Sequence, residues 1–129
     1  MSEPIVFISH FRMKEGKLEA YRRLQGEIVS QLQADRPRTV AYLAYVSASG
    51  SEMTAVHAFP DAEAMDAHFA GADERSRAAY EYLVPDGWEI YGRGSDESVG
   101  GMKREAAVAE VRLTLQPELV AGFLRLQAE

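Results

Sequence analysis

The residue best suited to acid–base chemistry is His68, in the segment 59–71, FPDAEAMDAHFAG. Asp61 is a typical helix N-cap, and Met65 and Phe69 follow it at helical spacing, so a helix is expected to begin here. His68 lies at the edge of the apolar face of this helix. Because an imidazole titrates close to neutral pH, a histidine in this position can exchange a proton with a bound molecule. A structural hydrogen bond at the edge of the core is the alternative role for His68.

Aromatic and polar side chains are expected to converge with this histidine between a sheet and its helices. The set comprises Phe7, Ser9, Phe59, His68, Tyr80, Tyr82 and Trp88. His68 and Tyr80 are the candidate catalytic pair, because a histidine near a tyrosine can move a proton on or off a phenol or an enol. The other five are candidate substrate-binding residues that suit a flat aromatic ligand. The alternative is that these rings only build the core.

Other kinds of chemistry find little support in the chain. It has no cysteine, and its three histidines show no metal-ligand spacing, so no metal site is expected. Ser9 and His10 are neighbours on a predicted strand and point to opposite faces, which excludes a nucleophile and base pair. No glycine-rich phosphate loop precedes a helix, and no nucleotide or other cofactor is expected.

Composition points to a single globular domain. The chain has 129 residues, 47% of them hydrophobic, and a formal net charge of -6 with scattered basic residues. Nucleic acid is therefore not an expected partner. No segment approaches the length of apolar residues that spans a bilayer, and the amino-terminal segment lacks the features of a signal peptide. We therefore expect a cytoplasmic protein without membrane association.

Hydrophobic periodicity predicts six elements in the order β-α-β-β-α-β. The expected ranges are a strand at 5–13, a helix at 18–32, strands at 39–47 and 52–59, a helical region from 61 to 83 that pauses at Gly71, and a strand at 88–93 after a turn at 85–87. This order is typical of the ferredoxin-like α+β fold, in which an antiparallel sheet carries both helices on one face. We assign residues 1–94 to this domain.

The first two predicted strands are apolar on both faces, although the helices cover only one. A second copy of the same sheet is the simplest cover for the other face, so a homodimer is expected. The alternative cover is the C-terminal extension, residues 95–129, packed on its own domain or on the partner. In that extension we expect a polar connector at 95–101 and an extra strand at about 106–115 that joins a sheet edge. The segment after Gln116 fits a short helix or a strand.

Residues 4–94 resemble the antibiotic biosynthesis monooxygenase-like proteins of the dimeric α/β-barrel superfamily. The resemblance is carried by FISHF at 7–11, EGKLE at 15–19 and FPDAEAMDAH at 59–68. It implies a dimeric barrel with its helices outside. It also implies one of three kinds of member: enzymes that oxidise polyphenols without metal or flavin, enzymes that degrade haem, and proteins without known activity.

This chain departs from the functional residues of that family. Haem-degrading members use an asparagine, a tryptophan and a histidine at positions that correspond here to Ser9, His68 and Ala78, and the chain has no asparagine. The leading hypothesis is a cofactor-independent monooxygenase acting on an aromatic polyketide-like or quinol substrate, with Ser9 and His68 at its polar edge. A non-catalytic binding or assembly domain is one alternative. The other is a proton-transfer enzyme, a cyclase or isomerase, that uses His68 with Tyr80 or Tyr82.

Overall fold

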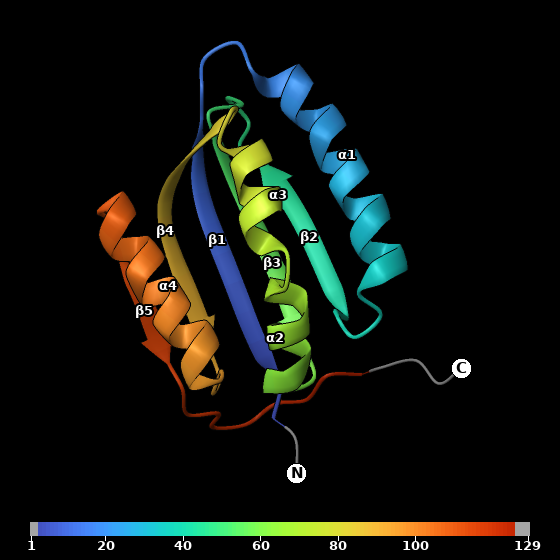
Figure 1. The fold of residues 1–129 in the computed structure, drawn as a ribbon, viewed down its shortest axis with the longest axis vertical. Helices are drawn as coiled ribbons and strands as arrows, with labels where there is room; N and C mark the ends of the chain where they lie inside the picture. Colours follow the sequence, from blue (N-terminus) through green and yellow to red (C-terminus); the bar gives the residue numbers. More distant parts are fainter. Residues whose placement is uncertain (1–2, 126–129) are drawn as a thin grey trace.

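The chain alternates strands and helices, and the computed structural model describes residues 3–125. The elements are β1 (Ile5–Met13), α1 (Leu18–Asp35), β2 (Ala41–Val46), β3 (Glu52–Phe59), α2 (Ala62–Phe69), α3 (Ala72–Ala79), β4 (Leu83–Tyr91), α4 (Asp96–Ala109) and β5 (Leu113–Gln116) (Figure 1). The predicted βαββαβ order is confirmed. The expected pause in the second helical region separates α2 from α3 at Gly71, whose φ of 79° is readily adopted only by glycine.

The strands form one five-stranded sheet in the order β2-β3-β1-β4-β5. The first four strands are antiparallel to their neighbours, as predicted, whereas β5 pairs with β4 in parallel and makes the sheet mixed. In the centre, Ser9 of β1 lies opposite Ala55 of β3 on one side and Trp88 of β4 on the other. The ferredoxin-like α+β fold is thus present, with one added strand at the edge.

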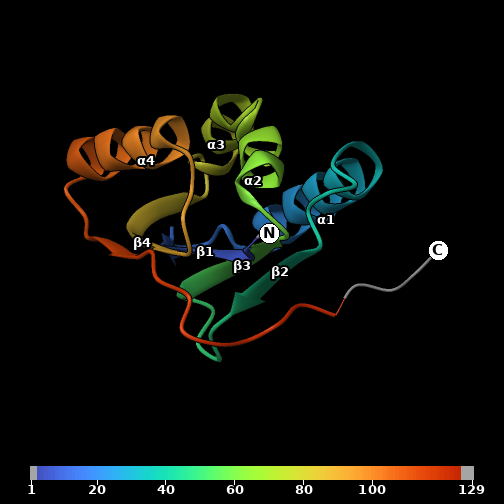
Figure 2. The ribbon, with the colours of Figure 1, turned by 90° about the horizontal axis from the view of Figure 1, so that it is seen from below.

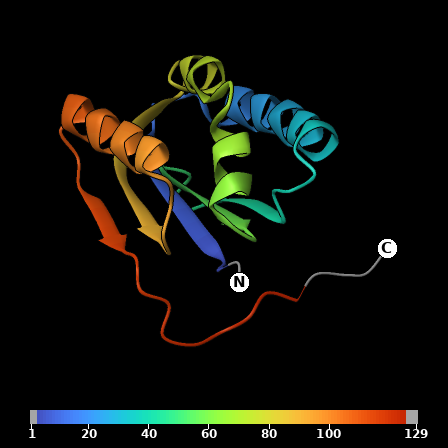
Figure 3. The same cartoon turned by 60° about the horizontal axis from the view of Figure 1, so that its bottom comes forward.

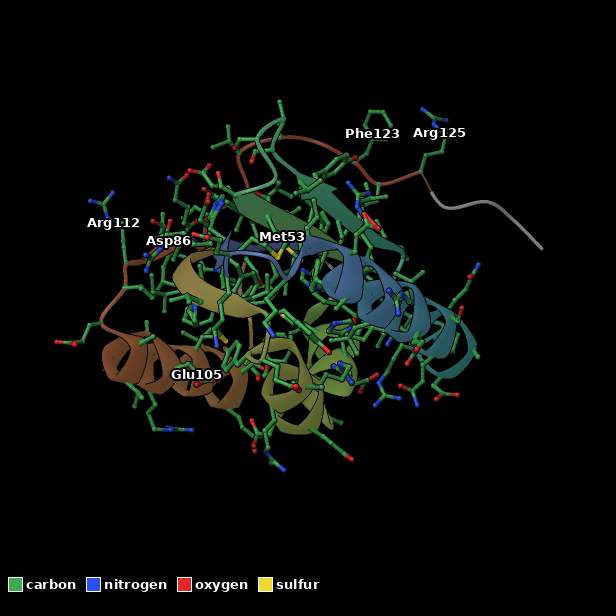
Figure 4. The ribbon with its side chains drawn as sticks, turned by 90° about the horizontal axis from the view of Figure 1, so that it is seen from above. Met53, Asp86, Glu105, Arg112, Phe123 and Arg125 are labelled. Atoms are coloured by element: carbon green, nitrogen blue, oxygen red, sulfur yellow. The ribbon has the colours of Figure 1, made fainter. Side chains whose placement is uncertain are left out.

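All four helices lie on the same face of the sheet (Figure 2). Residues of β1, β3 and β4 that point to this face form two buried clusters with the helices. The larger cluster packs Met65 of α2 and Met102 of α4 against Trp88. The smaller cluster joins Tyr21 of α1 to Met53 of β3, which Figure 4 shows between the sheet and the helices.

The C-terminal extension differs from the expected connector and strand. Residues 96–109 form α4, which packs on the sheet of its own chain, and only Leu113–Gln116 form a strand. Ser95 caps the helix through the backbone N–H of Ser98, and the buried residues Ser98, Met102 and Ala106 recur every four positions. The alternation of apolar residues after 106 indicated a strand. The alanines in this segment favour a helix instead, and the helix extends to Ala109. The prediction that the extension adds a strand to a sheet edge is confirmed.

The last predicted strand of the ferredoxin-like unit begins earlier than expected. β4 starts at Leu83, so residues 85–87 lie inside the strand and form no turn. The register between β1 and β4 shifts between His10 and Phe11, opposite these residues. A bulge accommodates proline and glycine within a strand. The shift in register therefore allows residues 85–87, which were predicted to form a turn, to continue the strand.

After β5 the chain continues without helix or strand to the end of the described residues at 125. This segment runs from the β5 edge toward the β2 edge on the side of the sheet away from the helices (Figures 2 and 3). Phe123 points away from the sheet and is 74% exposed (Figure 4). Leu43 and Tyr45, on the helix-free face of β2, are 48% and 58% exposed. The described part of the extension therefore leaves this part of the open face uncovered. Residues 126–129 of the extension lie outside the described part.

Candidate functional site

A cavity of about 550 Å³ lies between the sheet and the helices. Its sheet side is made by Phe7, Ser9 and Phe11 of β1, His57 of β3 and Trp88 of β4. The helices contribute the other walls, with His68 from α2, Arg75 from α3 and Glu105 from α4. Aromatic and imidazole rings therefore make up about a third of the lining residues, and polar groups are placed among them and the aliphatic side chains, as in many small-molecule sites.

Five of the seven predicted site residues line this cavity: Phe7, Ser9, His68, Tyr80 and Trp88. The other two do not. Phe59 is fully buried under α2 with its ring centroid 5.2 Å from that of His68, so it supports the histidine from behind. Tyr82 follows α3 and packs on the cluster around Leu83. Sequence spacing placed these residues on the helix-covered face of the sheet but could not separate the residues that line the cavity from those behind them.

His68 is held as an uncharged imidazole on the cavity wall. α2 begins at its Asp61 cap, where Asp61 Oδ1 accepts a hydrogen bond from Ala64 N at 2.8 Å, and this fixes the face that the helix buries. His68 is 3% exposed, and its Nδ1 lies 2.8 Å from Thr39 Oγ1. Burial, followed by the nearby His57, Arg75 and Arg36, lowers the pKa of His68 to about 3.

A second histidine, His57, lies beside the first and was not selected from the sequence. Its Nδ1 donates to the carbonyl oxygen of Phe7 at 3.0 Å. Because a carbonyl only accepts, Nδ1 carries the hydrogen, and Nε2 is left with its lone pair. Burial lowers the pKa of His57 to about 4. The strand alternation that places Ala55 and Phe59 on the buried face places His57 there too, and that signal was available in the sequence.

A hydrogen-bonded chain runs from α1 to Tyr42, whose ring contacts the histidine pair. Tyr21 donates its hydroxyl proton to Gln25 Oε1 at 2.8 Å, and Gln25 Nε2 donates to the Tyr42 hydroxyl at 2.7 Å. The Tyr42 ring contacts His57 edge-on, with ring centroids 4.8 Å apart. Because the Tyr42 oxygen accepts from Gln25, its own proton is free to be donated elsewhere. Burial raises the pKa values of both tyrosines, which therefore remain protonated.

Carboxylates gather on the α4 side of the cavity. Asp66 Oδ1 accepts hydrogen bonds from the hydroxyls of Ser95 and Ser98, both at 2.6 Å, and this links α2 to the start of α4. Glu97 and Glu105 also line this side, and Figure 4 labels Glu105 on α4. Burial raises the pKa of Tyr80, and the Glu105 carboxylate raises it further. Tyr80 is therefore a protonated phenol at neutral pH.

The opposite face of the sheet carries a separate polar cluster. His10 Nε2 pairs with Glu89, whose other carboxylate oxygen accepts from the Tyr91 hydroxyl. His10 Nδ1 lies 3.4 Å from Thr54 Oγ1. This cluster lies on the open face of the sheet, away from the helix-side cavity. Within residues 3–125, no group of three or more metal-ligating side chains is placed to hold a metal ion, and no helix is long and apolar enough to cross a membrane.

The fold and cavity define a ferredoxin-like α+β protein with a mixed sheet and a layer of four helices. No family model and no curated protein matches the sequence, whereas solved structures match the fold. MupZ from Pseudomonas fluorescens is similar at 16% identity, with 95% of each chain covered and a TM-score of 0.71. A mutant of SnoaB, a cofactor-independent oxygenase from Streptomyces nogalater, is similar at 12% identity, with 73% of this chain and 96% of that chain covered and a TM-score of 0.60.

A protein from Chloroflexus aurantiacus provisionally assigned as an antibiotic biosynthesis monooxygenase is similar at 12% identity. It covers 68% of this chain and 90% of its own, with a TM-score of 0.56. The chain thus has the fold of the antibiotic biosynthesis monooxygenase-like proteins, as the resemblance in the sequence predicted. MupZ covers more of this chain than either of the other two proteins.

Proposed function

We propose that this protein is an enzyme that takes a proton from an aromatic or conjugated small molecule bound in the helix-side cavity. In the leading form of the proposal, molecular oxygen then oxidises the substrate anion without a cofactor. The observation that carries the proposal is the pair of uncharged imidazoles, His57 and His68, on the wall of an aromatic-lined cavity. The fold shared with SnoaB, a cofactor-independent oxygenase, supports the oxidative form.

In this mechanism His68 is the base and Tyr42 donates to the developing oxyanion. An imidazolium at His68 is unfavourable in the empty cavity because burial lowers its pKa to about 3. It becomes less unfavourable when the proton comes from the substrate itself, because the imidazolium and the substrate anion then attract each other. The anion passes electrons to oxygen. For an anthrone-type methylene, one oxygen atom becomes the carbonyl oxygen and the other leaves as water with the two hydrogens that the carbon loses.

A second candidate function is proton transfer without oxidation, as in a cyclase or isomerase. The protonated Tyr80 phenol favours it, since Tyr80 lines the same cavity as the neutral His57 and His68. A site that presents an acid and a base to one molecule can remove a proton at one atom and return it at another. Both candidate functions use His68, and they differ in whether oxygen is consumed.

We also propose that a second copy of the chain covers the open sheet face. Leu43 and Tyr45 are exposed there in the single chain, while the neighbouring Tyr42 points to the cavity on the other face. Burying such a face against its own copy removes apolar area from water and follows two-fold symmetry.

Oxygen uptake with a panel of anthrones and hydroquinones tests the proposed function on the metal-free protein. The oxidative form predicts uptake that is lost in His68→Ala and retained in His10→Ala, a matched histidine change on the opposite face. Substrate turnover without oxygen uptake would favour the proton-transfer form. If uptake were lost in His10→Ala and retained in His68→Ala, the reaction would take place on the open face of the sheet. Binding of these compounds without any turnover would show that the protein is a non-catalytic binding module, and would contradict both catalytic forms of the proposal.

A further inference from the structure

Two arginines meet at the C-terminal end of α2, beside His68. Arg36 Nη2 donates to the carbonyl oxygen of Ala70 at 2.8 Å, and Arg75 Nη1 donates to the same oxygen at 3.4 Å. Arg75 Nη2 also donates to the backbone oxygen of His68 itself. A Cβ placed on Gly71 would lie 3.7 Å from both guanidinium groups, so the two cations lie close together.

Neither cation is neutralised by a carboxylate within residues 3–125. The ion pairs in this part of the chain use other basic residues, and those at the start of α2 join Arg38 to Asp61 and Glu63. Arg36 Nε is buried and has no hydrogen-bond partner. The end of α2 offers only about half a negative charge in compensation for two guanidinium groups. Burial, and then Arg36, lower the pKa of Arg75.

Arg75 is also the only lysine or arginine among the described residues that line the cavity. An anionic group in the cavity can therefore form a charge-assisted hydrogen bond with the remaining N–H groups of Arg75. Four carboxylates line the cavity: Glu97 and Glu105 of α4, Asp66 of α2 and Asp73 of α3. Asp66 accepts hydrogen bonds from the hydroxyls of Ser95 and Ser98, and Asp73, like Glu105, raises the pKa of Tyr80, so these carboxylates repel an anion from the Tyr80 and α4 side. The guanidinium of Arg75 and these carboxylates together orient a molecule with one acidic group so that this group lies at Arg75, near His68.

We propose that Arg75, supported by Arg36, is a subsite for an anionic group, a carboxylate or a phosphate, carried by the aromatic molecule that occupies the cavity. This inference rests on the proposed function and narrows its substrate to an aromatic acid. The aromatic part contacts the rings of Phe11 and Trp88, and the anionic group pairs with the guanidinium of Arg75. Such an arrangement holds the reacting atoms at a constant distance from His68.

Calorimetry with four probes tests this subsite: naphthoate, its nearly isosteric uncharged amide naphthamide, naphthyl phosphate and inorganic phosphate. Trp88 is the single tryptophan of the chain and lines the cavity, so its fluorescence reports occupancy independently. We expect the preferred aromatic anion to bind roughly 10-fold or more tightly than naphthamide, the range of a charge-assisted hydrogen bond. A preference for naphthoate over naphthyl phosphate, or the reverse, identifies the anion. Tight binding of inorganic phosphate alone would contradict a subsite that requires the aromatic part.

Variants of the arginines complete the test. Arg75→Gln should abolish the preference for the anionic probe and keep naphthamide binding, which also reports that the variant is folded. Arg75→Lys should retain part of the preference, Arg36→Gln should weaken it less, and Arg77→Gln, an exposed change on the same helix, should leave it intact. Equal binding of naphthoate and naphthamide, unchanged in Arg75→Gln, would overturn the anionic subsite and leave the cavity as a binding site. Failure of every aromatic probe to bind would contradict the proposed function and the subsite with it.

Discussion

The rings of His57 and His68 lie with their centroids 5.1 Å apart at an interplanar angle of 76°. One ring comes from β3 and the other from α2, and each has its Nδ1 engaged, by the Phe7 carbonyl and by Thr39 respectively. Two imidazoles this close in a buried setting cannot both be protonated at low cost. The pair therefore remains uncharged, and it affects both the stability of the fold and the chemistry of the cavity.

Acid should destabilise the protein well above the pH at which carboxylates titrate. The pKa falls from an ordinary 6.5 to about 4 for His57 and to about 3 for His68 in the folded state. Below pH 6.5 the unfolded chain therefore binds protons that the folded chain does not, and stability falls as pH falls toward those values. Each histidine lowers the free energy of unfolding by roughly 1.4 kcal/mol per pH unit in this window.

Urea denaturation from about pH 6.5 to 4.5 measures this dependence, since that window lies below the ordinary histidine pKa and above most carboxylate titration. The variant His57→Phe keeps an aromatic ring at the site and removes one titrating group. We expect the dependence on pH to fall by about half in this variant. An unchanged dependence would show that His57 is protonated in the folded state.

His68 should matter to the reaction more than to the fold. In His68→Gln a polar side chain remains near Thr39, but no group can take a proton, so the rate should fall by roughly 10²-fold to 10⁴-fold. The expected loss is in kcat, with only a small change in KM. Steady-state kinetics on the best substrate measures both, and circular dichroism checks the fold. Activity within twofold of the unmodified protein would remove His68 from the mechanism.

Asp66 should hold α4 against α2. In Asp66→Ala the hydroxyls of Ser95 and Ser98 lose the acceptor that they share. Because Ser98 is buried, its unpaired hydroxyl should lower the free energy of unfolding by roughly 1–3 kcal/mol, and amide exchange should accelerate at the start of α4. Asp35→Ala, at the exposed end of α1, is the matched control and should change stability by less than about 0.5 kcal/mol. Equal effects of the two changes would argue against the link.

The proposed dimer should depend on the open sheet face. Leu43→Glu introduces a charge where the two sheets would meet, and burying an unpaired carboxylate is strongly unfavourable, so this variant should be monomeric. Val108→Glu, on α4 and 83% exposed, is the control and should remain dimeric. Sedimentation equilibrium distinguishes the two states. A monomeric unmodified protein, or a dimer that Leu43→Glu leaves intact, would contradict the proposal.

Parts of the candidate site could be predicted from local pattern and parts could not. The cap at Asp61 and the helical spacing of Met65 and Phe69 were sufficient to place His68 on a buried helix face, because these depend on residues close in the chain. The helix from Asp96 was missed. Its signal, the spacing of Ser98 and Met102, was masked by two neighbouring glycines and by a short alternation of apolar residues.

The sequence by itself determined the order of the elements from β1 to β4, the ferredoxin-like class and the face on which Ser9 and His68 lie, because periodicity and capping are local properties of the chain. Only the tertiary structure decided which residues meet. Gln25 bridging Tyr21 and Tyr42, and Arg36 meeting Arg75 at the end of α2, depend on how α1 and α3 pack over the sheet. Contacts between elements depend on how the elements pack, which sets interatomic distances to within about an ångström. The spacing of residues along a sequence does not specify these distances.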